Sequence, residues 1–125
     1  MEKLYLHTDG GSRGNPGPAA IGVVLFDQSE KEIVTFCECI GDTTNSVAEY
    51  RALIKGLEIA ASHTRNELSV FMDSEFIVKQ LNGQYRIKTA SMYPLFQEVR
   101  DAERAFQKVT YTHVPRTNKR QTRAD

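Results

Sequence analysis

Hydrophobic and polar positions follow two different periods along this chain of 125 residues. Short apolar runs at 4–8, 21–26 and 33–40 have the length of β-strands and are flanked by turn-forming residues. The glycine- and proline-rich segment 10–18 and the polar segment 27–32 connect the three runs, and we expect both to be turns. Since links this short leave no room for a crossover, they predict an antiparallel meander.

The apolar spacing then changes to that of an α-helix. It predicts a helix over 46–63, with Asn45 or Ser46 as its N-cap. A short apolar run at 68–72 predicts a fourth strand. The residues after it predict a helix over 74–81, which ends at an Asn-Gly pair.

The remainder of the chain adds one helix and one strand to this pattern. Apolar residues at helical spacing predict a helix over 91–106, and the run 109–114 predicts the fifth strand. Strands connected through helices pair in parallel, so the sheet should be mixed and flanked by helices. The fold class is therefore α/β, and a length of 125 residues predicts a single domain over 1–125.

The composition is that of an ordinary globular protein, with 40% hydrophobic and 26% charged residues, which excludes wholesale disorder. No apolar run approaches the roughly 20 residues that cross a bilayer, and the first residues contain no stretch of signal-peptide type. Cys37 and Cys39 share one face of a predicted strand, where packing explains them better than metal binding. Two cysteines at this spacing indicate a reducing compartment. We therefore expect a cytoplasmic protein with no membrane partner.

The charges balance over the whole chain, with 16 Lys and Arg against 16 Asp and Glu, which argues against an obvious cationic nucleic-acid binder. Their distribution is uneven, however. Residues 27–42 hold five acids and one base, whereas residues 108–125 hold five bases and one acid. Such a charged end is either an ordinary solvated surface or a local cationic patch for a phosphate backbone, and zero net charge excludes neither.

Three acids lie where a purely structural role does not fully explain them. Asp9 ends the first strand and Asp73 ends the fourth, and ligands bind at the carboxyl ends of strands in sheets of this type. A turn or a helix cap is the alternative for each. Glu49 shares a helix face with Gly56 and Ala60, whose small side chains indicate close packing on the sheet. A carboxylate buried there costs several kcal/mol unless it is paired or binds a metal.

Asp125 is a fourth acid, set in a run of bases. Clustered carboxylates repel one another unless a cation compensates, and oxygen ligands without nearby His or Cys select Mg²⁺ or Mn²⁺. Two such ions about 4 Å apart stabilise the attacking and leaving oxygens of a phosphoryl displacement. An acid cluster beside a glycine turn and a basic tail therefore suggests a metal-dependent nuclease.

Four blocks of the sequence carry a resemblance to a known family. They are TDGGSRGNPGPAAIGVVL at 8–25, TTNSVAEYRALIKGLE at 43–58, MDSEFIVKQLNG at 72–83 and, with lower fidelity, YTHVPRTNKRQTRAD at 111–125. In their order, and in the spacing of the first three, they resemble the type 1 ribonucleases H. The absence of a basic protrusion after the third block resembles the compact bacterial and archaeal branch.

The resemblance implies a five-stranded mixed sheet in the order 3-2-1-4-5 and a two-metal-ion endonuclease. Such an enzyme hydrolyses the RNA strand of an RNA–DNA hybrid to 5′-phosphate and 3′-hydroxyl ends. The implied catalytic and metal-binding residues are Asp9, Glu49, Asp73 and Asp125, which would hold two Mg²⁺ ions, with Mn²⁺ as a substitute. By analogy, Asp9 would bridge both ions and Asp125 would help to hold the one that activates water. Glu49 and Asp73 would hold the ion at the leaving oxygen.

The resemblance also implies contacts with the hybrid, chiefly in its wide and shallow minor groove, which displays the RNA 2′-hydroxyls. The candidate substrate-binding residues are Gly11, Ser12, Asn15, Thr44, Asn45, Ser46, Ser74, Glu75 and Arg116. Among them, Thr44 would help to hold a phosphate of the DNA strand. We expect the hybrid to be the partner of a monomer, with no obligate protein partner.

The last block departs from the family pattern. The run between Arg116 and the final Asp is longer than in relatives, and Gln121 stands where they carry Asn, so the register of Asp125 stays open. Relatives also carry a mobile loop His, whereas His113 falls in a predicted strand, so we expect no catalytic His. Relatives continue into a helix that we expect to be truncated here. The alternative function is a non-cleaving module of the same fold that binds hybrids or double-stranded RNA.

Overall fold

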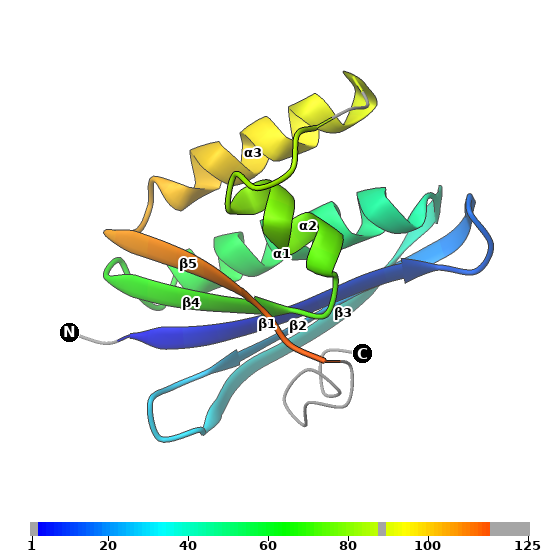
Figure 1. Cartoon of the computed structure of the whole chain (residues 1–125). Coiled ribbons are helices and arrows are strands. Elements are labelled where there is room, and N and C mark those ends of the chain that lie inside the picture. Colours follow the sequence, from blue (N-terminus) through cyan, green and yellow to red (C-terminus); the bar gives the residue numbers. More distant parts are fainter. Residues whose placement is uncertain (1–2, 88–89, 116–125) are drawn as a thin grey trace.

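A computed structural model of the chain describes residues 3–87 and 90–115 (Figure 1). In chain order its elements are β1 (Leu4–Ser12), β2 (Gly17–Phe26), β3 (Glu32–Thr43), α1 (Asn45–Ala61), β4 (Glu67–Met72), α2 (Glu75–Leu81), the 3₁₀ helix η1 (Ala90–Met92), α3 (Tyr93–Glu103) and β5 (Lys108–His113).

The five strands form one mixed sheet in the order β3-β2-β1-β4-β5. Strand β1 pairs antiparallel with β2, which pairs antiparallel with β3. On its other side β1 pairs parallel with β4, which pairs parallel with β5. The predicted fold class and strand order are therefore confirmed. Because β1 and β4 are parallel neighbours, their carboxyl ends meet at one edge of the sheet.

Strands β1 and β2 extend into the segment that composition predicts to be a turn. Gly11 pairs with Ala20 and Ser12 pairs with Ala19, so only residues 13–16 connect the two strands. The hairpin is closed by the backbone of Arg13, whose N–H donates to the carbonyl of Pro18 over 2.8 Å. Glycine is favoured in turns, but nothing prevents it from pairing where a neighbouring strand is available, and the predicted turn over 10–18 is therefore too long.

The N-cap of helix α1 lies one residue before the two predicted N-caps. Thr44 is the N-cap, because its Oγ1 accepts a hydrogen bond from the N–H of Val47 over 3.2 Å. The prediction that Asn45 or Ser46 caps the helix is wrong, since both lie inside it. All three positions have polar side chains that suit a cap, so the local sequence does not distinguish them. Oδ1 of Asn45 accepts instead from the N–H of Ser12.

The second half of the chain follows the predicted order with shorter helices. The predicted helix over 91–106 divides into η1 and α3, and Pro94 lies in the first turn of α3, where its missing N–H costs nothing. Arg100 on α3 donates to the carbonyl of Leu81 over 2.6 Å and forms an ion pair with Glu103 at 2.8 Å. These bonds connect α3 to the C-terminal end of α2.

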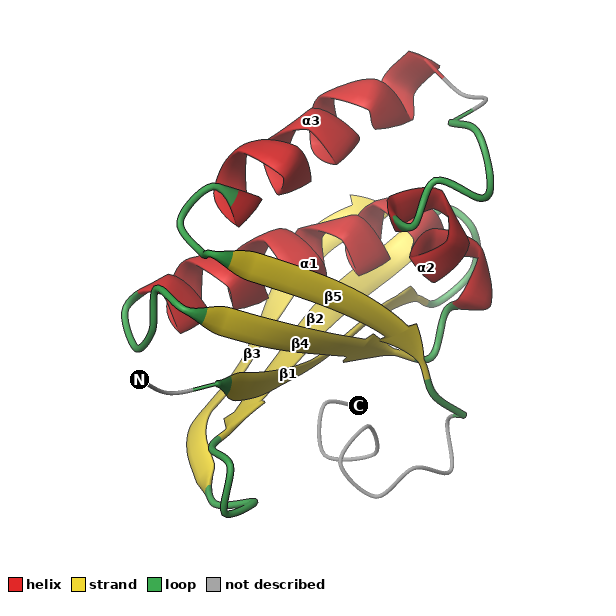
Figure 2. Cartoon of the chain, turned by 60° about the vertical axis from the view of Figure 1, so that its left-hand side comes forward, coloured by secondary structure: helices red, strands yellow, loops and turns green. Residues whose placement is uncertain are grey.

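Helices α1, α2 and α3 lie on the same side of the sheet (Figure 2). The main core fills the space between them and the strands, and its fully buried members include Leu6, Leu25, Leu53, Val70 and Ile77. On the opposite side of β1, His7 stacks on Phe71 with 4.9 Å between ring centroids. Helix α1 therefore covers one face of β1, and aromatic side chains cover the other.

Strand β3 is an edge strand whose side chains are mostly exposed or half-buried. Cys37 and Cys39 are both free and exposed, so the interpretation that packing explains them is wrong. A shared strand face buries a pair of residues only where another element packs on that face, and the described residues leave Cys37 and Cys39 exposed. Within residues 3–87 and 90–115, no helix has the length and apolar character that a membrane crossing requires.

Candidate active site

Asp9 and Asp73 lie side by side because of the register between two parallel strands. His7 of β1 pairs with Phe71 of β4. Two residues further along each strand direction come Asp9, within β1, and Asp73, which directly follows β4. The parallel pairing therefore brings together two carboxylates that are far apart in the sequence, as expected for the carboxyl edge of such a sheet.

Glu49 reaches the same place because α1 lies directly on the backbone of Gly10. A Cβ atom at Gly10 would be 2.2 Å from the carbonyl oxygen of Ala48 and 2.7 Å from the nitrogen of Glu49. A second close approach occurs at Gly56, where a Cβ atom would be 2.8 Å from Cγ2 of Thr8. The sequence indicated the role of Gly56 through its helix face. It did not indicate Gly10, whose neighbour α1 is distant in the sequence.

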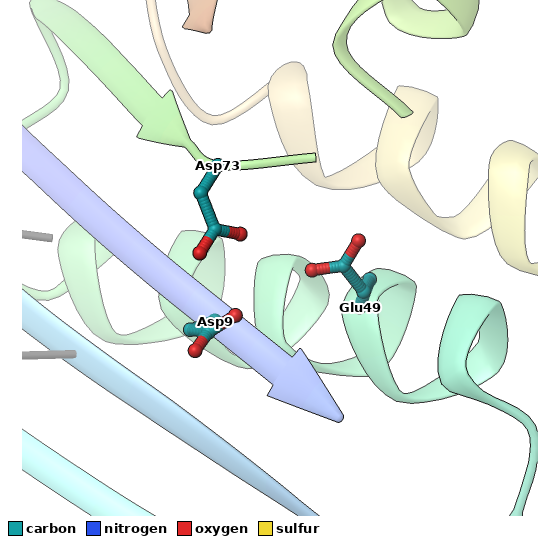
Figure 3. Close-up of side chains that lie close together, drawn as sticks. All are labelled: Asp9, Glu49 and Asp73. Atoms are coloured by element: carbon teal, nitrogen blue, oxygen red, sulfur yellow. The ribbon is translucent and has the colours of Figure 1, made fainter. Parts of the chain in front are cut away.

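The three carboxylates form one cluster (Figure 3). One oxygen from each of Asp9, Glu49 and Asp73 lies within 4.8 Å of the others. Glu49 is buried, with 7% of its surface exposed, whereas the two aspartates are half-buried. In Figure 3 the carboxyl groups point toward one another from β1, from α1 and from the end of β4.

The chemistry of this cluster fits a hard divalent cation. All three side chains offer carboxylate oxygens, and among the described residues no His or Cys belongs to the group. Oxygen donors of this kind suit Mg²⁺, Mn²⁺ or Ca²⁺ rather than zinc. Like charges held this close together repel one another, and a bound cation would turn that repulsion into attraction.

Four candidate substrate-binding residues lie where the β1–β2 hairpin meets the first turn of α1. Oδ1 of Asn45 accepts a hydrogen bond from the N–H of Ser12 over 2.9 Å. Oδ1 of Asn15 accepts one from the N–H of Asn45 over 3.0 Å. Gly11 lies beside this amide, and a Cβ atom on Gly11 would be 3.4 Å from Oδ1 of Asn45, an ordinary van der Waals contact.

Thr44 and Ser46 border a cavity of about 320 Å³ between α1, α2 and η1. Its walls also include Asn15, Phe76 and Met92. Since Oγ1 of Thr44 caps α1, this residue has a structural role in addition to the predicted phosphate contact, which stays a prediction. The first turn of α1 points its N–H groups toward this side, and such a helix end favours anions.

Two of the remaining candidates, Ser74 and Glu75, directly follow Asp73 at the start of α2, and the others lie near the end of the chain. Oγ of Ser74 caps α2 by accepting from the N–H of Ile77 over 3.4 Å. Glu75 is exposed and lies 3.9 Å from the ammonium group of Lys79. Arg116 and Asp125 lie outside the described residues, so their proposed roles stay predictions.

An exposed aromatic pair, formed by a residue of α2 and one of the segment that follows α2, was not singled out by the sequence. Phe76 and Tyr85 are 49% and 43% exposed, and their ring centroids are 5.7 Å apart. The ammonium group of Lys79 lies 5.2 Å from the Tyr85 centroid. Aromatic rings next to a cation form the kind of surface on which single-stranded nucleic acids stack. The sequence did contain one signal for this surface, since Phe76 is an aromatic residue on the polar side of the predicted helix 74–81.

Comparison with known proteins decides the family. The model of the family described as "Reverse transcriptase-like" matches residues 7–124. The crystal structure of RNase H1 from the halophilic archaeon Halobacterium salinarum NRC-1 shares 35% identity and a TM-score of 0.91 with this chain. That match covers 98% of this chain and 92% of the other. The chain belongs to the ribonuclease H family.

Other members of the ribonuclease H family match over a similar extent. The N-terminal RNase H domain of Rv2228c from Mycobacterium tuberculosis is 38% identical, with a TM-score of 0.92 over 98% of this chain and 93% of that chain. LC11-RNase H1 in complex with an RNA/DNA hybrid is 37% identical, with a TM-score of 0.88 over 98% of this chain and 91% of that chain. This ribonuclease H chain spans 34% of the curated bifunctional protein Rv2228c and 60% of the Halobacterium salinarum ribonuclease HI.

Proposed function

We propose that this chain hydrolyses the RNA strand of RNA–DNA hybrids and leaves 5′-phosphate and 3′-hydroxyl ends. The observation that carries the proposal is the convergence of Asp9, Glu49 and Asp73 at the carboxyl edge of the sheet. Relatives that bear the names ribonuclease H and ribonuclease HI support it, as does the complex of LC11-RNase H1 with an RNA/DNA hybrid.

Asp9, Glu49 and Asp73 would hold the divalent ions, with Asp125 as the proposed fourth ligand. Mg²⁺ is the ion we propose, since the donors are carboxylates. Sites that act on phosphates commonly bind Mg²⁺ through a few carboxylates, substrate phosphate oxygens and water. When bound, such ions make water a better nucleophile at neutral pH and stabilise charge on the attacking and leaving oxygens.

The protein contributes position and rigidity to this chemistry. Each carboxylate comes from a different element, and two of those elements are held by strand pairing while the third is held by backbone contact at Gly10. A site built on packed elements keeps its reacting groups in place, which contributes a large part of a catalytic rate. Phe76, Tyr85 and Lys79 would hold a nucleic-acid strand beside the cluster by stacking and charge.

The test is an incubation of the full chain with labelled RNA–DNA hybrid, duplex RNA and duplex DNA, each with Mg²⁺, Mn²⁺ or EDTA. We expect cleavage of the hybrid's RNA strand alone, in the presence of a divalent ion alone. Binding of the hybrid without products would assign the non-cleaving module instead. Cleavage that survives EDTA would contradict the role of the acid cluster.

A further inference from the structure

A buried hydrogen bond joins α1 to α2, the two helices that border the acid cluster. The hydroxyl of Tyr50, on α1, donates to Oε1 of Gln80, on α2, over 2.7 Å. Tyr50 is fully buried and Gln80 is 5% exposed. An unmade bond at this depth leaves polar atoms without a partner, which costs free energy. The bond should therefore persist in the folded state and hold the two helices at one separation.

Each partner of the bond is close in sequence to one acid of the cluster. Tyr50 directly follows Glu49, so the two residues are about 1.5 Å apart along the axis of α1. Gln80 lies in the last turn of α2, and Asp73 directly precedes Ser74, the N-cap of that helix. The bond therefore connects the helix that carries Glu49 to the helix that follows Asp73.

Asp73 lies at the junction between β4 and α2, with a hydrogen bond on either side. Before it, the carbonyl of Met72 accepts from the N–H of Val114 over 2.9 Å. After it, Oγ of Ser74 caps α2. From this junction its carboxylate extends toward the other two acids (Figure 3). The direction in which α2 leaves β4 therefore affects the backbone angles at Asp73 and, through them, the direction of its carboxylate.

The other contacts of α2 hold it to different parts of the fold. Its apolar side chains pack into the core, and hydrophobic contacts of this kind are not directional. Arg100 on α3 donates to the carbonyl of Leu81 over 2.6 Å. Nδ2 of Asn82 donates to the carbonyl of Tyr111 on β5 over 3.2 Å. These two bonds connect the end of α2 to α3 and β5, whereas the bond of Gln80 connects it to α1.

We propose that Tyr50 and Gln80 are positioning residues. Their hydrogen bond sets the distance between the carboxylates of Glu49 and Asp73, and with it the affinity of the acid cluster for a divalent ion. The inference rests on the proposed function, since it takes the cluster as a metal site. Mg²⁺ requires a nearly ideal octahedral arrangement of oxygens at about 2.0–2.1 Å, so a small displacement of one ligand weakens binding.

The test measures the Mg²⁺ affinity of the full chain by isothermal titration calorimetry, without hybrid. Gln80 also lines the cavity beside Thr44, and the absence of hybrid keeps any effect on nucleic-acid binding out of the measurement. We expect Tyr50→Phe, which removes the hydroxyl alone, to weaken Mg²⁺ binding about threefold to tenfold. This is less than the roughly 10–100-fold effect of a group bonded directly to a metal ligand, because the bond acts through two helices.

Tyr111→Phe is the matched control, because it removes the same atom from another buried tyrosine. The hydroxyl of Tyr111 donates to Glu103 and connects β5 to α3. Both variants should unfold at lower urea concentrations than the wild type, but Tyr50→Phe alone should lose Mg²⁺ affinity. A bond with a merely structural role would lower stability and leave the Mg²⁺ affinity of Tyr50→Phe unchanged.

A second substitution tests whether the two residues act through their bond. Gln80→Met keeps the length of the side chain and removes the acceptor. The variant that combines it with Tyr50→Phe should bind Mg²⁺ as weakly as either single variant, and not more weakly. Losses that add up in the double variant would refute the pair.

The outcomes separate this inference from the proposed function. If Tyr50→Phe binds Mg²⁺ as the wild type does, or if Tyr111→Phe loses as much affinity as Tyr50→Phe, the inference is wrong. If the affinities follow the expected order but the wild type cleaves no hybrid, the inference stands and the proposed enzymatic function fails.

Discussion

Gly10 and Gly11 are neighbours in the sequence, yet a methyl group would meet different surroundings at each. At Gly10 it would overlap the backbone of α1, with 2.2 Å to the carbonyl oxygen of Ala48, whereas at Gly11 its nearest contact is 3.4 Å away. We expect Gly10→Ala to reduce the free energy of unfolding by at least about 1–3 kcal/mol, because α1 must move away from β1. Gly11→Ala should change it by less than about 1 kcal/mol. Urea unfolding of both variants tests this, and equal midpoints would contradict it.

Asp73 is the acid of the cluster whose replacement should lower the cleavage rate without lowering the stability of the metal-free protein. We expect Asp73→Asn to lower hybrid cleavage on the order of a hundredfold, because one charged ligand of the ions is lost. Stability without metal should stay equal or increase, since one like charge leaves the cluster. The matched control is Asp101→Asn on α3, whose carboxylate contacts the exposed Arg104 at 3.7 Å. A wild-type rate in Asp73→Asn would refute the proposed site.

At the scale of elements, one tyrosine connects β5 to α3 and makes stability depend on pH. The hydroxyl of Tyr111 donates to the carboxylate of Glu103 over 2.5 Å. Burial, and then this bond to Glu103, raise the pKa of Tyr111 far above its usual value near 10. The folded state therefore keeps its proton where the unfolded state loses it. The stability from Tyr111 is present below about pH 10 and falls as the pH rises beyond that value.

We therefore expect the free energy of unfolding to decrease above about pH 10, and to decrease less steeply in Tyr111→Phe. At neutral pH the variant should lose about 1 kcal/mol through the missing hydrogen bond. Urea unfolding between pH 7 and 11 measures both effects. An unchanged slope in the variant would show that other groups cause the alkaline loss. Tyr50 should retain part of the slope, because burial raises its pKa to about 12.

How well each element could be predicted depended on the source of its stability. The strands and helices that fill the core show their period in sequence, so β2, α1 and β4 were predicted from side chains such as Val23, Leu53 and Val70. The ends of β1 and β2 depend on pairing between distant residues, which local composition does not reveal. The same holds for the site. Glu49 could be placed on a helix face, but its meeting with Asp9 and Asp73 depends on strand register and on the approach of α1 to Gly10.

At the scale of the whole molecule, the acid cluster couples metal binding to folding. The carboxylates of Asp9, Glu49 and Asp73 converge only in the folded chain, so an ion that binds them stabilises that state. We expect millimolar Mg²⁺ to increase the melting temperature measured by circular dichroism, and Ca²⁺ to do so without supporting cleavage. Asp73→Asn should abolish most of the increase, and Asp101→Asn should retain it. An equal increase in both variants would place the ion elsewhere.

The central position of β1 has a consequence for the order in which the chain is made. Asp9 and Glu49 both precede β4, yet β1 receives its parallel neighbour only when residues 67–72 have been synthesised. A ribosome-bound chain that ends before Glu67 holds two of the three clustered acids and lacks both β4 and Asp73. Activity during synthesis or refolding would therefore require β4 to have joined β1, and a β1–β2–β3 meander alone would be inactive.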